Sequence, residues 1–253
     1  MYPYIRICDE KVSIYSVCVL LGAGVSLLLL TKLLRRKQLL STYMPLVAVS
    51  LFGLILGAKL FGVLSKGIVN LAQVGRFDVY DSVLNSGIVY WGGLLGVLAT
   101  LRIACHFRKR DFGEVSDILG IVIPLFHVFG RMGCYFAGCC YGREYTGLLA
   151  LPYRIGWDGE WMLRFPTQLA EVVLGLSLFT IHFFQYFQVR QHGKTSLLFR
   201  YLLTYSVFRF VIEFYRGDAV RGVFHGISFS QIVCIMVLVS LSVYYKKHRR
   251  KCG

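Results

Sequence analysis

Two arginines stand inside stretches that are otherwise almost purely apolar. Arg131 follows ILGIVIPLFHVFG, and Arg209 lies within LLTYSVFRFVI. An ionisable side chain in such surroundings is costly and marks a functional site unless a partner compensates it. A guanidinium group binds phosphate oxygens through two parallel hydrogen bonds. The two arginines therefore predict a phosphate site in apolar surroundings, for which a phospholipid headgroup is the natural ligand.

Further titratable side chains accompany each arginine. FRFVIEFYR places Arg209, Glu213 and Arg216 on one helical face. Glu213 could simply neutralise Arg209 in a structural ion pair, but Arg131 would then have no partner in its own helix. His127 precedes Arg131 by one turn, and its ordinary pKa of about 6.5 suits proton transfer near neutral pH. Its alternative role is that of a hydrogen-bonded packing residue.

The elements that must position these side chains are hydrophobic helices. Hydrophobic residues make up 56% of the 253-residue chain and charged residues only 16%, whereas soluble domains are about a quarter charged. Windows of about 20 apolar residues suit helices that span a bilayer. The chain has seven such windows, at 12–31, 44–64, 86–105, 116–138, 167–187, 196–215 and 228–245. We predict an all-α membrane protein of seven transmembrane helices, forming a single domain over residues 1–253.

The net charge of +15 reflects membrane topology rather than nucleic-acid binding. Sixteen of the 28 Lys and Arg residues fall in four clusters that seven spans place on one side. Nine lie on the opposite side, together with most of the acids. The positive-inside rule then predicts an external N-terminus and a cytoplasmic C-terminus. The three basic residues that remain are Lys59, Arg131 and Arg209, all within predicted spans.

Small residues predict close helix packing. GLILG (53–57) and GGLLG (92–96) place glycines four residues apart, which permits close crossings. Glycines 130, 133 and 138 allow a backbone or a ligand to approach the Arg131 segment. The segment of about 141–164, between the fourth and fifth spans, is polar and aromatic. It could cap the site or lie at the membrane interface.

With these residues identified, the chain resembles the prolipoprotein diacylglyceryl transferases of bacteria along nearly its whole length. GRMGCYFAGCCYGR (130–143) is similar to the family signature Gly-Arg-x-Gly-Asn-Phe-x-Asn-Gly-Glu-x-x-Gly-Arg. SIYSVCVLLG (13–22), LGAKLFGVL (56–64), RFPTQLAE (164–171) and FRFVIEFYRGD (208–218) resemble further family segments in the same order.

The resemblance implies transfer of the diacylglyceryl group of phosphatidylglycerol to the lipobox cysteine of a prolipoprotein, in the bacterial plasma (inner) membrane. The partners that we predict are phosphatidylglycerol, membrane lipid and the prolipoprotein signal peptide, with no cofactor, no metal and no nucleic acid. Arginines aimed at the leaving phosphate would stabilise its developing charge. The catalytic residues that we predict are Arg131, Arg209, Glu213 and His127. The predicted substrate-binding residues are Tyr15, Gly130, Gly133, Cys134, Cys139, Gly142 and Arg216.

The chain departs from the family pattern near the reacting thiol. Trp91 stands where the family has a histidine, and Trp91 cannot accept a proton. His127, Glu213, or no base beyond the arginines are the remaining alternatives for activating the thiol. A relative that binds anionic lipid with an altered acceptor, or without catalysis, is the alternative function.

Cys134, Cys139 and Cys140 leave three interpretations open. They could be inert small residues in a tight turn. They could form a disulfide or supply a thiolate that carries the diacylglyceryl group covalently. They could also bind a metal together with His127 or His225, although the spacing CxxxxCC is not typical of zinc sites.

Overall fold

The computed structural model describes residues 4–7, 10–87, 89–154, 159–188, 196–217, 223–224 and 226–252, and most of them are helical. Its chain divides into two compact units. The first consists of Met1–Leu33 and Ser116–Asp218, and the second of Leu34–Val115 and Ala219–Gly253. His225, a predicted metal-ligand alternative, lies outside the described residues.

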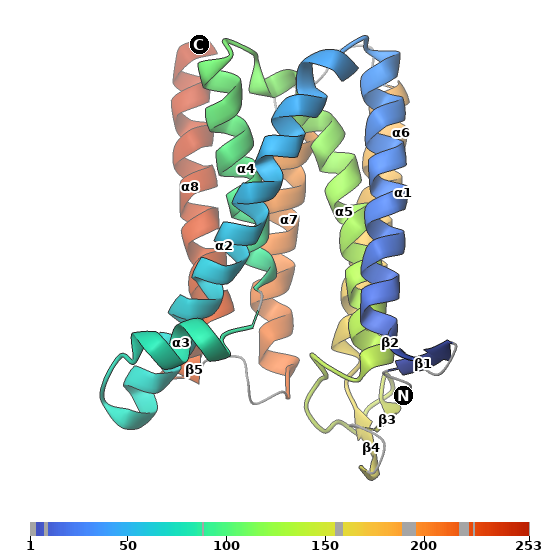
Figure 1. The fold of residues 1–253 in the computed structure, drawn as a ribbon, viewed down its shortest axis with the longest axis vertical. Coiled ribbons are helices and arrows are strands. Elements are labelled where there is room, and N and C mark those ends of the chain that lie inside the picture. The colour runs from blue at the N-terminus through green and yellow to red at the C-terminus, as the bar shows by residue number, and fades with distance from the viewer. Residues whose placement is uncertain are drawn as a thin grey trace. The chain divides into compact units, whose positions relative to one another are not determined.

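The first unit contains the helices that carry Arg131 and Arg209 (Figure 1). Its helices are α1 (Ile14–Arg36), α5 (Phe112–Ala137), α6 (Thr167–Gln188), α7 (Leu197–Ile212) and the 3₁₀ turn η1 (Glu213–Tyr215). Of α1 only the part up to Leu33 belongs to this unit, and of α5 only the part from Ser116 onward. Two antiparallel hairpins, β1 (Tyr4–Ile7) with β2 (Glu10–Ser13) and β3 (Leu151–Arg154) with β4 (Trp161–Arg164), lie at the end where α1 begins and α5 ends. We call this the hairpin end of the unit.

Helix α5 holds the first unit together through polar contacts with its neighbours. The His182 ring on α6 lies 2.8 Å from the carbonyl oxygen of Gly120, measured from Nδ1. The carboxylate of Asp117 accepts a hydrogen bond from the backbone N–H of Leu197 at 2.8 Å. This bond satisfies one of the free N–H groups at the start of α7. Helix α5 is thereby tied to both α6 and α7.

The second unit contains α2 (Leu40–Val74), α3 (Val79–Asn85), α4 (Tyr90–Phe107), α8 (Phe229–Cys252) and the short hairpin of β5 (Val223–Phe224) and β6 (Ile227–Ser228). The predicted glycine crossing is confirmed. A Cβ on Gly57 would collide with the carbonyl oxygen of Gly92, and one on Gly96 with that of Gly53. Helices α2 and α4 therefore meet backbone to backbone. Lys59 on α2 donates to the carbonyl of Ser86 at 3.1 Å, which gives this half-buried cation a partner within its own unit.

Several helices have the length and apolar character of membrane spans. Among the described residues, α1, α2, α5, α6 and α8 meet both requirements, and α3 with α4 adds a sixth span if this bent pair is one. Large apolar side chains such as Leu20, Phe52 and Leu56 are more than two-thirds exposed on α1 and α2, as lipid-facing residues are. The chain is thus a multi-pass, mostly helical membrane protein.

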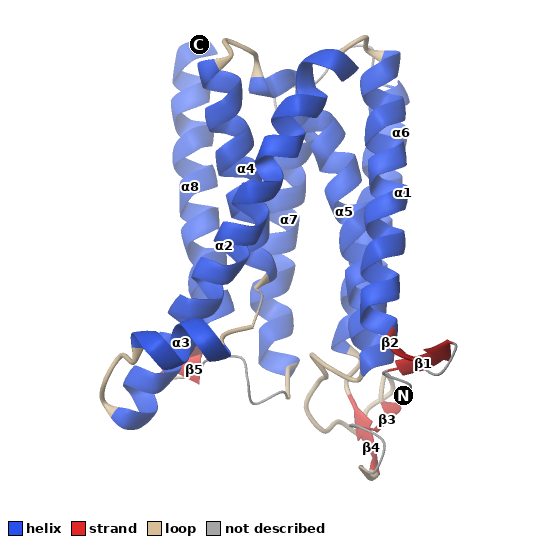
Figure 2. Ribbon diagram, in the orientation of Figure 1, coloured by secondary structure: helices blue, strands red, loops and turns tan. Residues whose placement is uncertain are grey.

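Each of the seven apolar windows coincides with a helix, but the helices differ in length. Helix α7 has only 16 residues, because the chain tightens into η1 at Glu213. That length is at the lower limit of what crosses a hydrocarbon core. The hairpins and α3 were not predicted, and β3 and β4 lie within the segment 141–164 (Figure 2).

Candidate functional site

A single buried carboxylate joins the two arginines. Glu171, on the second turn of α6, is 2% exposed. Its Oε2 lies 2.9 Å from Nε of Arg131 on α5, and its Oε1 lies 3.0 Å from Nη1 of Arg209 on α7. The hydroxyl of Tyr205 also donates to Oε2, at 3.3 Å. One carboxylate therefore binds cations from two neighbouring helices.

His127 packs inside this cluster. Its Nε2 lies 3.1 Å from Nε of Arg131 and 3.3 Å from Oε2 of Glu171, and its ring contacts Tyr205 edge to face. Nε2 accepts from Arg131 when it carries no proton, and it can donate to Glu171 only when it carries one. In the first state its lone pair is already engaged by the Arg131 N–H. His127 is therefore well placed to hold Arg131, and the prediction that it removes the thiol proton stays a prediction.

Arg209 is held between two carboxylates. Besides the contact with Glu171, its Nη2 lies 2.7 Å from Oε2 of Glu213, one turn later. Arg216, which follows η1, is 8% exposed, and its backbone forms an antiparallel bridge with Gly142. Arg131 and Arg209 therefore balance the charges of Glu171 and Glu213 within one buried cluster.

Arg131 keeps its terminal edge for a ligand. Within the described part of the chain, both of its polar contacts are made by Nε. The two terminal nitrogens, which form the edge that grips a phosphate, are not consumed by those contacts. Beside it, a Cβ on Gly130 would meet no atom within 4 Å, so the helix surface there is open. This arrangement combines a fixed guanidinium with space next to it.

Gly133 and Tyr15 mark the contact between α5 and α1. A Cβ on Gly133 would lie 3.1 Å from the Tyr15 ring and 3.1 Å from Cβ of Cys18. Gly133 therefore allows α5 to pack closely against α1, which is one of the two uses predicted for these glycines; the other is the approach of a ligand. Tyr15 is 43% exposed, so its ring is shared between this contact and the surroundings of α1.

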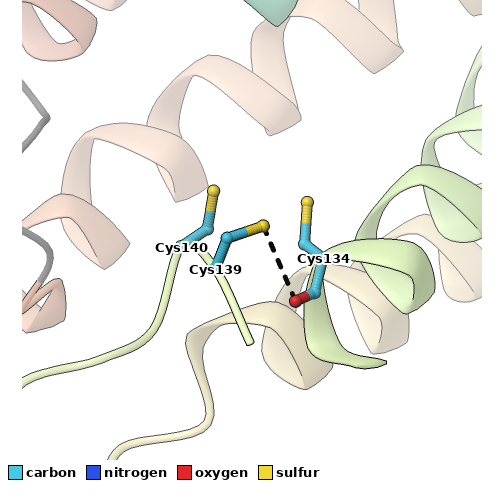
Figure 3. Close-up of side chains that lie close together, drawn as sticks. All are labelled: Cys134, Cys139 and Cys140. Carbon is cyan, nitrogen blue, oxygen red and sulfur yellow. Dashed lines mark hydrogen bonds between the residues drawn. The ribbon is translucent and has the colours of Figure 1, made fainter. Parts of the chain in front are cut away.

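The end of α5 is a hydrogen-bonded turn that gathers the three cysteines (Figure 3). Gly138 has φ of 75°, its N–H bonds to the carbonyl of Tyr135, and the Cys139 N–H bonds to that of Cys134. This is a Schellman motif, which folds the chain back over the last helical turn. The Sγ atoms of Cys134, Cys139 and Cys140 all lie within 4.8 Å of one another. The Cys139 thiol donates to the carbonyl of Cys134 at 3.7 Å.

The loop after the turn is fixed by α6 and by the chain after η1. Thr167 donates to the carbonyl of Cys140 at 2.9 Å, and Gln168 donates to that of Cys139 at 2.7 Å. Hydrogen bonds from Cys134 and Cys139 lower the pKa of Cys140 well below its ordinary value. A Cβ on Gly142 would collide with the carbonyl oxygen of Phe165. The loop can therefore hold its side chains in a defined arrangement.

The predicted site residues are all found in the first unit. The structure brings His127, Arg131, Arg209 and Glu213 into one cluster, and it places Cys134 and Cys139 at the end of the same helix. Sequence reasoning missed Glu171 as the shared partner, and with it Tyr205 and Gln168. Arg131 has no acidic partner in its own helix, as expected, and its carboxylate partner Glu171 comes from α6. The available signal was Glu171 itself, an acid inside an apolar window near its start.

Comparisons with known proteins agree with one another. A family model described as prolipoprotein diacylglyceryl transferase matches residues 4–246. Three similar relatives are each named phosphatidylglycerol–prolipoprotein diacylglyceryl transferase. The one from Leptothrix cholodnii is 29% identical over 79% of this chain and 75% of its own length. The one from Clostridium tetani is 26% identical over 90% of both chains, and that from Campylobacter jejuni is 29% identical over 92% of this chain and 89% of its own.

Proposed function

This chain belongs to the prolipoprotein diacylglyceryl transferase family, and we infer that it is a transferase that moves the diacylglyceryl group of phosphatidylglycerol to a prolipoprotein cysteine. The observation that carries the role of the site is the geometry of Arg131. Its Nε is fixed by Glu171 and His127, and its terminal edge is left for a ligand.

We propose that this terminal edge binds the phosphate of the lipid headgroup. When the carbon–oxygen bond to the phosphate breaks, negative charge grows on the leaving phosphate oxygen. A guanidinium already fixed in a site with little water stabilises that charge without reorganising, which is a large contribution to catalysis. Arg209 and Glu213 keep Glu171 in place, and Glu171 keeps Arg131 in place.

The acceptor is proposed to be the lipobox cysteine at the end of a signal peptide. A thiol reacts as its thiolate, and nearby cations lower a thiol pKa. The buried arginines supply such a field at the hairpin end of the first unit. The proposed partners are thus phosphatidylglycerol and a prolipoprotein, with no role for nucleic acid.

We place the enzyme in the bacterial plasma membrane with seven spans, an external N-terminus and a cytoplasmic C-terminus. The basic clusters between the apolar windows support this orientation. The hairpin end of the first unit would then face the outer side. Prolipoprotein signal peptides that have crossed the membrane would meet the site there.

A second candidate is a relative that binds anionic lipid but has an altered acceptor or no catalysis. It is favoured by one observation, the buried Trp91 on α4 at the position where the family carries a histidine. This candidate predicts phosphatidylglycerol binding without transfer to a lipobox peptide.

The two candidates are separated with purified protein in vesicles that contain phosphatidylglycerol labelled in its diacylglyceryl part. A lipobox peptide should gain the label and release an equal amount of glycerol phosphate. The same peptide with serine in place of cysteine should stay unlabelled, as should both peptides in vesicles of phosphatidylcholine. Lipid binding without any labelled cysteine peptide would establish the second candidate instead.

A further inference from the structure

We propose that Cys134, Cys139 and Cys140 together bind one zinc ion, whose fourth coordination position takes the thiol of the acceptor polypeptide. The identity of the acceptor rests on the proposed function, whereas the metal site rests on the cysteines alone. The proposal goes beyond the sequence-based expectation of a protein without a metal.

The sulfur atoms are close to the separation that zinc requires. All three Sγ atoms lie within 4.8 Å of one another. A zinc–thiolate bond of about 2.3 Å gives tetrahedral ligands a separation of about 3.8 Å. Side-chain rotations that move each sulfur by about 1 Å or less would close the site around an ion. The Cys134 and Cys140 side chains point the same way, and the Cys139 side chain extends between them toward Cys134 (Figure 3).

The backbone places these cysteines together for a local reason. The Schellman motif brings Cys139, which lies two residues past the last residue of α5, back against Cys134 in the last helical turn, where the Cys139 N–H bonds to the Cys134 carbonyl. Cys140 then adopts φ of 57°, an uncommon conformation for a side chain other than glycine. The bonds from Thr167 and Gln168 hold the two loop carbonyls. A spacing that looks unlike a zinc motif therefore still produces three convergent sulfurs.

The charges around the cysteines suit a thiolate–zinc centre. Three thiolates and one zinc ion carry a net charge of −1. Arg131 precedes Cys134 by three residues on the same helix, and Arg216 is bridged through its backbone to Gly142. Arg131 thus lies one helical turn before Cys134, and the chain that carries Arg216 runs beside the cysteine loop; positive charges in these places favour an anionic centre.

Three protein ligands leave one position open. Among the described residues, no fourth His, Cys, Asp or Glu joins the three sulfurs at this distance. Structural zinc sites have four protein ligands, whereas reactive ones have three and a replaceable water. Cys139 is exposed, so an incoming thiol has access from its side. A thiol that binds zinc loses its proton outright.

The open position supplies a route to the thiolate that needs no side-chain base. The acceptor thiol replaces the bound water, and its proton passes to solvent. The sulfur then attacks the carbon of the diacylglyceryl group that is bonded to the phosphate oxygen. A carbon–sulfur bond forms while the bond between that carbon and the phosphate oxygen breaks. The electron pair of that bond leaves with glycerol phosphate, and the thioether product is released from zinc.

Metal content and cobalt spectroscopy test the site without reference to transfer. Purified full-length protein should contain about one zinc per chain, and cobalt-loaded protein should show the intense sulfur-to-cobalt absorption of a thiolate site. Cys134→Ser, Cys139→Ser and Cys140→Ser should each lower zinc content at least tenfold. Cys105→Ala, which removes a buried thiol of α4, is the matched control and should retain the metal. Zinc absent from the wild-type protein, copper in its place, or a disulfide among the three cysteines would overturn the proposal.

The fourth position is tested on the cobalt-loaded wild-type protein, so that misfolding of a variant cannot obscure the result. A lipobox peptide should change the cobalt spectrum, and its serine analogue should not. An unchanged spectrum would remove the acceptor thiol from the site. Arg131→Lys should retain zinc but lose transfer. If the wild-type protein binds zinc but never transfers lipid, the proposed function is refuted and the metal site still stands.

Discussion

Glu171 and Arg131 face each other across α6 and α5, with 2.9 Å between Oε2 and Nε. The other oxygen of the same carboxylate contacts Arg209 of α7 at 3.0 Å. Each of the three side chains is less than one-tenth exposed. Loss of the one carboxylate would therefore leave the charge of Arg131 uncompensated and Arg209 with Glu213 alone, and loss of either arginine would leave an excess of negative charge. The cluster is a single electrostatic unit with Glu171 at its centre.

Removing the charge of Glu171 should destabilise the protein more than any surface substitution. Glu171→Gln keeps the shape of the side chain but leaves buried guanidinium groups uncompensated, which costs about 3–5 kcal/mol. Glu144→Gln is the control, because Glu144 is exposed and lies 3.7 Å from Arg164. Denaturant unfolding in lipid bicelles measures both. Equal stability of the two variants would contradict the central role of Glu171.

Two glycines of the signature segment should respond in opposite ways to alanine. Gly142→Ala would drive a Cβ into the Phe165 carbonyl and disturb the bridge to Arg216, so stability and transfer should both fall. Gly130→Ala meets no atom within 4 Å and should be at least as stable as the wild type, since alanine favours helix by about 1 kcal/mol.

If lipid lies against the open surface at Gly130, the Gly130→Ala enzyme should show a raised KM for phosphatidylglycerol with its stability preserved. Thermal unfolding and a lipid titration separate the two effects. An unchanged KM would place the lipid elsewhere.

His127→Gln distinguishes positioning from proton transfer. Nε2 of His127 accepts a hydrogen bond from Arg131, and this role needs no change in protonation. Glutamine offers an acceptor in a different position, so we expect the variant's turnover to be lower by a similar factor at every pH. The alternative is a base, whose loss would matter most near neutral pH and least at about pH 9, where thiols ionise unaided. Recovery of the variant at about pH 9 would identify His127 as the base and contradict the positioning role.

Close packing of α2 on α4 should depend on Gly57. Gly57→Ala places a methyl group against the Gly92 carbonyl and should lower the unfolding temperature. Gly24→Ala on α1 is matched in kind, because a Cβ there meets nothing within 4 Å, and it should have little effect. Equal unfolding temperatures for Gly57→Ala and Gly24→Ala would contradict the prediction that α2 and α4 must pack this closely.

The helices and some of their contacts were predictable because their causes are local. Apolar windows of sufficient length located each long helix, and glycines four residues apart located the α2–α4 crossing. The Arg209–Glu213 pair followed from a spacing of four residues on one helix. In each case the partners are near in sequence or repeat a known packing pattern.

The centre of the site was not predictable in the same way. Glu171 is 40 residues from Arg131 and 38 from Arg209, so only the packing of three helices brings them together. The three cysteines were singled out from the sequence, but the convergence of their sulfur atoms was not predicted. That convergence depends on Gly138 ending α5 in a left-handed conformation, which the spacing CxxxxCC alone does not reveal.

Transfer by Arg131→Lys tests the account most directly. Lysine keeps the positive charge that Glu171 requires, so the protein should stay folded, but it cannot both hold Glu171 and present a two-pronged edge to phosphate. We expect the rate of diacylglyceryl transfer to a lipobox peptide to fall by about 100-fold or more. Arg102→Lys, at an exposed arginine of α4, should transfer at the wild-type rate. A folded Arg131→Lys enzyme that transfers as fast as Arg102→Lys would contradict the assignment of Arg131 as the phosphate-binding residue.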